Sequence, residues 1–492
     1  MSGERYNVLI RGGTVVDGAG TPGVRADVAI RGDRIAAVGL LADAEASRVI
    51  EVAGLTVAPG FIDVHSHDDA ACLTTPLDFK LMQGVTADIL GNCGAGIAPY
   101  NPEQRANMLV GIVLGEVPEA TWRTFGEFMR VVEKANPAIN VACLVPHGAV
   151  RYATLGLKSR APSDAELDQM REQIDEGMAA GAAGLSTGLI YPPGAFARTD
   201  EVIECAKIAA RHGGVYVSHI RNEGDRLIEA MEEALHIGKQ ADLPVQISHH
   251  KAGSPAVWGK VRETIAMMDA RRAAGQDVTF DVYPYTAAST VLSAFAAAAE
   301  GLDFDLVLLA TVPGHEELEG KTLRESSDIL GVPAEQAASR ILRDSPGTTA
   351  IFFLMNEDDI RTVISQPECM IGSDGLPTPG GKPHPRLYGT FPRVIQRYVR
   401  EEAVLSLEEA VRKMTSRPAD RFKLAGRGRI EEGAFADIVV FDPARIEDVA
   451  TYEEPRQYPA GIEYVLVNGK VAAEGGKQTE RSSGRLLRRG QE

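Results

Sequence analysis

The sequence has few cysteines and no long apolar run. Its five cysteines are scattered, and none belongs to a CxxC pair. That spacing argues against a disulfide framework and is typical of reduced thiols in a cytosolic protein. No stretch of about 18 consecutive apolar residues occurs, so we expect no membrane span. The N-terminus, MSGERYNVLIRGG, also lacks an apolar signal core, and we therefore expect a cytoplasmic protein.

A surplus of positive charge is also absent. The 492 residues include 51 Lys and Arg against 68 Asp and Glu, which gives a net charge of −17. This balance argues against nucleic acid or an anionic membrane as a partner. With 44% hydrophobic and 24% charged residues, the composition is that of a soluble globular protein. The length allows roughly two to four domains, or one large barrel with an accessory domain.

Both ends of the chain are rich in β-strand patterns. Near the N-terminus, YNVLIRGGTVVDG and ADVAIRGDRIAAVG each place two β-branched runs around a glycine turn. Near the other end, ADIVVFDP and IEYVLVNGKVAAEGG show the same pattern. Because chain termini often lie close together, we predict one small β-sandwich domain built from residues 1–60 and 425–480. The polar, basic residues 481–492 are expected to form a flexible tail.

The middle of the chain, residues 61–424, alternates strand-like runs with amphipathic helical segments, the pattern of an α/β protein. One such segment, SDAELDQMREQIDEGMAAG, has Ser163 as its N-cap and ends at Gly181. Eight strand-like runs occur, at 61–64, 88–90, 141–145, 184–185, 215–217, 245–247, 278–282 and 370–372. They predict a (β/α)8 barrel of about 250 residues or more, with a doubly wound sheet as the alternative. Residues 287–348 are too long for one loop, and we interpret them as an insertion before the eighth strand.

Potential metal ligands recur at the carboxyl ends of five of these runs. In chain order they are His65, His67, Cys93, His219, His249, His250 and Asp374. The carboxyl ends of barrel strands converge on one face. Imidazole, thiolate and carboxylate are the ligand types that suit zinc. We therefore predict a metal site on this face.

Each of these residues alone has a simpler interpretation. Histidines two apart on a strand share a face by geometry alone, so His65 and His67 could lie in a solvated polar loop. Cys93 alone would more often be a small buried hydrophobe, and Asp374 before a glycine is a common turn residue. Only the recurrence at five strand ends favours a metal. We place Asp68, Asp69 and His147 in loop or supporting positions, and His212, His236 and His315 on the surface.

Eight short motifs follow one another along the chain: GFIDVHSHDD, GNCGAG, GLSTGLIYPPG, SHIRNEG, ISHHKAG, DVYPYTAAST, GSDG and HPRLYGTFPR. Together they resemble the N-acyl-D-amino-acid deacylases (D-aminoacylases) of the amidohydrolase superfamily. The resemblance extends from the β-rich N-terminus to GAFADIVVFDP. It implies zinc-dependent hydrolysis of a small-molecule substrate, an N-acyl-D-amino acid, to a carboxylate and a free D-amino acid.

The resemblance also implies the metal ligands. His65 and His67 match the ligands at the end of the first strand, and Cys93 matches a thiolate that can bridge two metal positions. His219 and His249 match the histidines that hold one tightly bound zinc together with this thiolate. Related amidohydrolases often bridge two metals with a carboxylated lysine after the fourth strand. Here that place reads GLSTGL, which argues against a dihydroorotase- or hydantoinase-like site.

Asp374 matches the catalytic aspartate and is also a predicted metal ligand. Zinc lowers the pKa of bound water to about 7 and polarises a carbonyl. Asp374 would take the proton of the water and deliver it to the departing nitrogen. Adjacent strand residues point to opposite faces, so His249 and His250 cannot easily both be ligands. The family pattern favours His249, and we expect His250 to pack behind it or to contact the substrate.

Substrate-binding residues follow from the same resemblance. Lys251, Tyr283 and Arg386 match the groups that hold the α-carboxylate, for which a guanidinium offers two parallel hydrogen bonds and an ammonium a point charge. Tyr191 either donates to the amide carbonyl or packs beside the following prolines. Ser289 is expected to line the same pocket.

The segment after Ser289, TVLSAFAAAAEG, contains no cation. We therefore infer a neutral or hydrophobic D-side chain. The alternatives are an N-acyl-D-glutamate or D-aspartate deacylase, a D-peptide or cyclic-amide amidohydrolase, and a barrel that serves only as a binding module.

A second metal position and a homo-oligomer are both compatible with the sequence. The length of the insertion motivates the hypothesis that it closes over the substrate.

Overall fold

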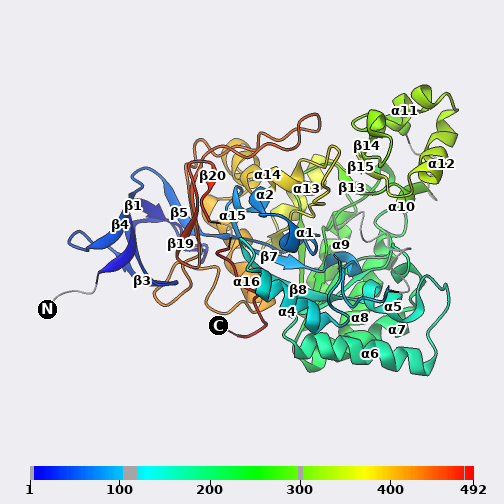
Figure 1. Cartoon of the computed structure of the whole chain (residues 1–492), viewed down its shortest axis with the longest axis horizontal. Helices are drawn as coiled ribbons and strands as arrows, with labels where there is room; N and C mark the ends of the chain where they lie inside the picture. The colour runs from blue at the N-terminus through cyan, green and yellow to red at the C-terminus, as the bar shows by residue number, and fades with distance from the viewer. Residues whose placement is uncertain (1–4, 103–118, 297–302, 481, 492) are drawn as a thin grey trace.

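The structure is a computed structural model, which describes residues 5–102, 119–296, 303–480 and 482–491. A β-domain that contains the N-terminus lies at one end, a barrel surrounded by helices forms the centre, and a small subdomain with α11 (Leu323–Leu330) and α12 (Ala334–Asp344) projects at the other end (Figure 1). Among the residues described, no helix is both long and apolar enough to span a bilayer.

Eight parallel strands form the barrel, each hydrogen-bonded to its neighbour in chain order. They are β6 (Phe61–Asp63), β7 (Val85–Leu90), β8 (Asn140–Pro146), β9 (Gly184–Gly188), β10 (Val215–His219), β11 (Val245–Ile247), β12 (Val278–Val282) and β16 (Cys369–Ile371). A parallel bridge between Ser66 and Gly375 closes the circle. Every strand residue is buried, as expected for parallel strands covered on both faces. The predicted barrel is confirmed, and its closure excludes the doubly wound alternative.

Helices cover the outside of the barrel. They are α1 (Ala71–Thr74), α2 (Asp78–Leu81), α4 (Phe125–Ala135), α5 (His147–Leu155), α6 (Asp164–Ala179), α7 (Thr199–Arg211), α8 (Leu227–Ala241), α9 (Val261–Ala273), α13 (Glu357–Ile364), α14 (Arg386–Arg393), α15 (Leu407–Met414) and α16 (Ser416–Phe422). The predicted N-cap of α6 is present, because the Ser163 hydroxyl and the Glu166 carboxylate each accept the other residue's backbone N–H.

The two ends of the chain build one nine-stranded sheet. Its strands are β1 (Tyr6–Val15), β2 (Val24–Arg31), β3 (Arg34–Gly39), β4 (Ala46–Glu51), β5 (Thr56–Pro59), β17 (Ile438–Phe441), β18 (Ile462–Val467), β19 (Lys470–Glu474) and β20 (Lys477–Gln478). The halves meet where β5 pairs antiparallel with β17. Val28 and Val57 from one end share a hydrophobic core with Ile438 and Leu466 from the other. The prediction of a β-domain formed by both termini is therefore confirmed.

The insertion after β12 is a folded unit. Its strands β13 (Ala288–Val291), β14 (Val307–Thr311) and β15 (Thr349–Phe352) form an antiparallel sheet. Short α10 (Ser293–Ala296) follows β13, and α11 and α12 pack on the sheet around a core that includes Leu309, Ile341 and Phe352. This separate core explains why the segment interrupts the barrel without disturbing it.

Residues 482–491, which fall in the segment expected to form a flexible tail, are hydrogen-bonded to strand β8 of the barrel. Val141 donates its N–H to the Arg485 carbonyl at 2.9 Å and accepts the Leu487 N–H at 2.7 Å. This part of β8 is free because β9 joins β8 only from Leu144 onward. The basic side chains are also paired, with Arg488 2.8 Å from the Glu133 carboxylate. An open strand edge and a nearby carboxylate therefore bind a segment whose composition suggested solvent exposure.

A fully buried lysine on α2, Lys80, lies among three carboxylates. Lys80 Nζ is 2.5 Å from Asp63 Oδ2, 3.1 Å from Asp68 Oδ2 and 3.9 Å from Asp88 Oδ1. Burial acts to lower the pKa of Lys80, but the carboxylates outweigh it and hold the pKa well above its usual value. The ammonium is therefore charged and compensates buried negative charge.

The same cluster joins the first and last strands of the barrel. Asp63 Oδ1 accepts the backbone N–H of His65 at 3.1 Å and that of Ser373 at 2.8 Å. Lys80 also donates to the Ser373 hydroxyl at 2.9 Å. The next residue, Asp374, donates its N–H to the His65 carbonyl at 2.7 Å. One buried ion pair therefore fixes the backbone beside two candidate site residues.

We predict that Lys80→Met lowers the free energy of unfolding by about 3–5 kcal/mol, because it leaves buried carboxylates without a counter-charge. Urea unfolding followed by circular dichroism measures the change. The control is Lys239→Met, on the exposed face of α8, for which we expect a change within about 0.5 kcal/mol. Equal stability of the two variants would contradict a structural role for the buried ammonium.

Candidate active site

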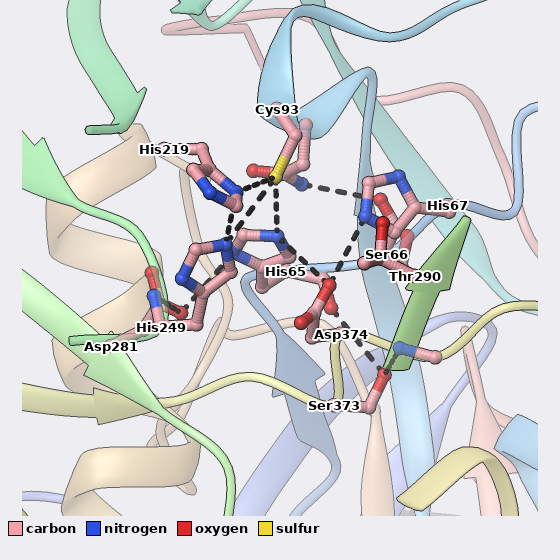
Figure 2. A network of polar contacts seen from close by, with 12 residues as sticks. His65, Ser66, His67, Cys93, His219, His249, Asp281, Thr290, Ser373 and Asp374 are labelled. Carbon is pink, nitrogen blue, oxygen red and sulfur yellow. Dashed lines mark hydrogen bonds and ion pairs between the residues drawn. The ribbon is translucent and has the colours of Figure 1, made fainter. Parts of the chain in front are cut away.

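Side chains from several barrel strands meet around the sulfur of Cys93 (Figure 2). Cys93 Sγ lies 3.3 Å from His65 Nε2, 3.6 Å from His219 Nδ1 and 3.6 Å from His249 Nε2. His219 Nδ1 and His249 Nε2 are themselves 2.8 Å apart. The structure therefore brings together four residues from the carboxyl ends of strands one, two, five and six.

Asp374 and His67 complete the cluster on its other side. Asp374 Oδ1 is 3.1 Å from His67 Nε2 and 3.4 Å from His65 Nε2. His65 therefore lies between the carboxylate and the Cys93 sulfur, as Figure 2 shows. One ligand atom each from His65, Cys93, His249 and Asp374 lie within 4.8 Å of one another, and all four residues are buried. Imidazole nitrogens, a sulfur and a carboxylate that converge in this way fit a zinc site.

The ionisation of Cys93 suits a metal ligand. Burial acts to raise the pKa of its thiol, but the charge of His65 and hydrogen bonds from His219 and His249 outweigh it and hold the pKa well below its usual value. Asp374 behaves in the same way, because the charge of Arg386 first and then of His65 lowers its pKa against the effect of burial. The cluster therefore presents a thiolate and a carboxylate.

Three site residues have left-handed backbone conformations, with φ of 53° at Cys93, 35° at His249 and 50° at Asp374. Such angles cost about 1–3 kcal/mol each in residues with a side chain and persist where the surroundings enforce them. At Cys93 the enforcement comes from the 3₁₀ turn η1 (Asn92–Gly94) in the motif GNCGAG. A Cβ atom at Gly91 would lie 2.3 Å from the Leu144 carbonyl oxygen, so only glycine fits before this turn.

Carboxylates support the histidines from behind, and these residues were not identified from the sequence. Asp281 Oδ1 lies 3.2 Å from His65 Nδ1 and accepts the His249 backbone N–H at 2.8 Å. Glu223 Oε1 lies 3.0 Å from His249 Nδ1. A carboxylate on the far ring nitrogen fixes the tautomer and orientation of a ligand histidine. The available signals were an acidic residue inside the apolar run TFDVY and a glutamate four residues after His219.

A cavity of about 330 Å³ opens beside the cluster. Tyr191, Lys251, Tyr283 and Ser289 all lie on its wall. The Tyr191 hydroxyl hydrogen-bonds the Thr290 hydroxyl at 3.0 Å, which links the barrel to the insertion across the cavity. The remaining wall is largely apolar and includes Ala149, Leu157, Ile190, Val291 and Leu376.

Arg386, which the resemblance assigns to the substrate carboxylate, lies behind the cavity wall. It is fully buried and is absent from the described residues on the cavity wall. Its Nη2 lies 3.0 Å from Asp374 Oδ2 and donates to the Ser289 carbonyl at 3.0 Å. The guanidinium carbon is 4.5 Å from the centre of the Tyr283 ring. Arg386 therefore lies behind Asp374 and Tyr283, where it neutralises the carboxylate.

His250 is not among the described residues that line this cavity. Its Nε2 is 3.0 Å from the Thr264 hydroxyl, and its ring packs edge-on against Phe280. Burial and the nearby Lys251 charge lower the pKa of His250 to about 4, so the ring is neutral. Both histidines follow the end of β11 at Ile247, so the left-handed backbone at His249, and not strand alternation, separates their directions. Of the two predicted placements, packing behind His249 agrees with these contacts better than a contact with the substrate.

Comparisons with known proteins agree with this geometry. An amidohydrolase family model matches residues 48–473. The chain is 42% identical to D-aminoacylase of Alcaligenes xylosoxydans xylosoxydans, over 99% of this chain and 98% of the relative. It is 43% identical to N-acyl-D-glutamate deacylase of the same organism, over 99% and 97%. The crystal structure of N-acyl-D-glutamate deacylase from Bordetella bronchiseptica with zinc and a phosphonate inhibitor superimposes with a TM-score of 0.93 at 39% identity, covering 99% of this chain and all of that one.

The two adjacent histidines give a matched test of the ligand assignment. We predict that His249→Gln loses most of the bound zinc, because its Nε2 faces the Cys93 sulfur. His250→Gln should keep zinc near the wild-type level, because its ring lies against Thr264 and Phe280 and not against the Cys93 sulfur. Elemental analysis of the purified proteins measures the metal. Zinc retained by the His249 variant, or lost from a folded His250 variant, would reverse the assignment.

Proposed function

Because this chain belongs to the amidohydrolase family and, within it, to the N-acyl-D-amino-acid deacylases, we propose that it hydrolyses the amide bond of N-acyl-D-amino acids with the help of zinc. The products are a carboxylate and a free D-amino acid. The observation that carries the proposal is the convergence of Cys93, His219, His249 and Asp374 beside a cavity that contains Lys251.

Cys93, His219 and His249 would hold the tightly bound zinc. His65, His67 and Asp374 would complete a second metal position on the other side of the cluster. Bound zinc supplies Lewis acidity, which polarises an amide carbonyl and lowers the pKa of water. The thiolate character of Cys93 and the mutual approach of the ring nitrogens support this assignment.

Asp374 would serve as the base and then as the acid of the reaction. Arg386 holds one of its oxygens at 3.0 Å, while the other faces His67 and the metal cluster. An ionised carboxylate fixed in this way can take a proton from the attacking water. It can then return the proton to the departing nitrogen, which is a poor leaving group until it is protonated.

Lys251 and Tyr283 would bind the α-carboxylate of the substrate on the cavity wall. Arg386 Nη1 has no hydrogen-bond partner among the residues that the structure describes, and a buried donor of this kind is one that a ligand can satisfy. Tyr191 would donate to the amide carbonyl once its hydroxyl leaves Thr290, with Ser289 beside it. These contacts favour a linear substrate with a free carboxylate over a cyclic amide.

A neutral or hydrophobic D-side chain suits the cavity best. Apart from the histidines of the metal cluster, Lys251 is the one basic residue among the described residues of the wall. A second substrate carboxylate would therefore face Leu157, Ile190 or Val291 without a partner. Acid-specific deacylases remain the alternative, because relatives named for D-glutamate and D-aspartate are 43% and 40% identical to this chain.

We also propose a cytoplasmic location. The five cysteines are buried and unpaired, a state typical of a reducing compartment.

The substrate proposal is tested with N-acetyl-D- and N-acetyl-L-amino acids that carry neutral, hydrophobic and acidic side chains. We expect hydrolysis of the neutral D-series and a kcat/KM lower by about tenfold or more for the acidic substrates, whose extra carboxylate would be buried without a partner. Chiral chromatography of the released amino acid measures both preferences. Preference for the L-series, or no hydrolysis at all, would refute the proposed function. Preference for D-glutamate would overturn only the choice of side chain.

The role of Asp374 is tested with Asp374→Asn, which retains the shape but cannot accept the proton. We expect kcat to fall by about 10²–10⁴-fold. The tightly held zinc should remain, because Cys93, His219 and His249 are unchanged. A kcat within tenfold of wild type in the zinc-loaded variant would remove Asp374 from its role as the base.

A further inference from the structure

Glu223 lies at the active site but has no part in the reaction described above. It follows His219 by four residues, lies on the cavity wall and has a side chain that is 14% exposed. Its Oε1 is 3.0 Å from His249 Nδ1 and 2.7 Å from Lys251 Nζ. A single carboxylate oxygen therefore joins a candidate zinc ligand to the candidate substrate-binding cation.

We propose that Glu223 is a positioning and specificity-determining residue that selects the metal-binding tautomer of His249 and competes with the substrate carboxylate for Lys251. The inference rests on the proposed function and deepens it. Loss of the Glu223 charge should weaken zinc binding and strengthen substrate binding. A purely structural ion pair would not produce these opposite effects.

The role of Glu223 in selecting the tautomer of His249 follows from which neighbours of His249 can accept a hydrogen bond. Nε2 faces Cys93 and His219, so a metal at the cluster requires the Nε2 lone pair and places the ring proton on Nδ1. Two groups lie within reach of Nδ1, Lys251 Nζ at 2.7 Å and Glu223 Oε1 at 3.0 Å. An ammonium only donates, whereas a carboxylate only accepts. Glu223 is therefore the group that can receive the Nδ1 proton.

The competition for Lys251 follows from the negative charges of Glu223 and of the substrate carboxylate. Lys251 is held by Glu223 and by the His249 carbonyl at 2.9 Å. The other predicted carboxylate-binding cation, Arg386, is paired with Asp374. Both cations are thus neutralised by the protein before substrate arrives, and a substrate carboxylate must share Lys251 with a like charge. Removing the charge of Glu223 would leave Lys251 more attractive to the substrate.

The backbone holds Glu223 in place for these contacts. The Asn222 side chain accepts the N–H groups of Gly224 at 2.9 Å and Arg226 at 3.0 Å, which orders the turn. Gly253 donates its N–H to the Glu223 carbonyl at 2.7 Å and so joins the loops that follow β10 and β11. A Cβ atom at Gly253 would lie 3.1 Å from that carbonyl oxygen, so the two loops are in close contact. Glu223 is therefore preorganised between His249 and Lys251.

The test compares Glu223→Gln with Glu233→Gln. Glu233 also forms an ion pair, at 2.8 Å from Arg221, has the same 14% exposure and lies away from the cavity. For Glu223→Gln we expect a zinc dissociation constant raised by about tenfold or more, measured by chelator competition. At saturating zinc we expect kcat to fall by about tenfold and KM for a neutral N-acetyl-D-amino acid to fall by about threefold or more. For Glu233→Gln all three constants should stay within about twofold of wild type.

A second variant separates the two effects. Glu223→Asp keeps the charge but retracts it from His249, so zinc affinity should fall while KM does not decrease. An unchanged zinc constant in both Glu223 variants would overturn the tautomer assignment, and an unchanged or raised KM in Glu223→Gln would overturn the competition for Lys251. If wild-type protein hydrolyses no N-acyl-D-amino acid, the proposed function fails, yet the zinc measurement still decides the role of Glu223 toward His249.

Discussion

The arrangement of the site depends on the buried ion pair between Asp63 and Lys80. A closed barrel needs its first and last strands to meet in one register, and the Asp63 carboxylate accepts N–H groups from both. A carboxylate so deep in the protein is stable only with a counter-charge, which Lys80 provides. His65 and Asp374, which follow on the two strands, are thereby held 3.4 Å apart. The chemistry of the cluster is thus coupled to the closure of the fold.

Much of this architecture was predictable, because apolar runs indicate the strands and polar residues at the strand ends indicate the site. Apolar runs located all eight barrel strands, and the positions of His65, Cys93, His219, His249 and Asp374 at their ends predicted a single cluster. What escaped prediction were residues whose partners are distant in sequence. Asp63 and Lys80 lie in the segments FIDV and DFKL, which carry no sequence signal of an ion pair. Only the folded chain shows that the two side chains meet. The positions of Arg386 and His250 likewise depend on packing that no local pattern records.

The site combines strain with support. Cys93, His249 and Asp374 hold unfavourable backbone angles, and each is fixed by contacts from a neighbouring strand or loop. The charged groups of the site are also paired, Arg386 with Asp374 and Lys251 with Glu223. Asp281 lies against the far nitrogen of His65, Glu223 against that of His249, and Arg386 against the carboxylate of Asp374.

The sheet built from both termini has a consequence for how the protein is made. β5 is complete when residue 59 has been synthesised, but its partner β17 ends only at residue 441. At about 5–20 residues per second, the ribosome needs tens of seconds to supply that partner. Throughout this interval the nascent chain presents an unpaired strand edge of the kind that other chains can bind. The free edge of β5 therefore needs shielding in the nascent chain until translation is nearly finished.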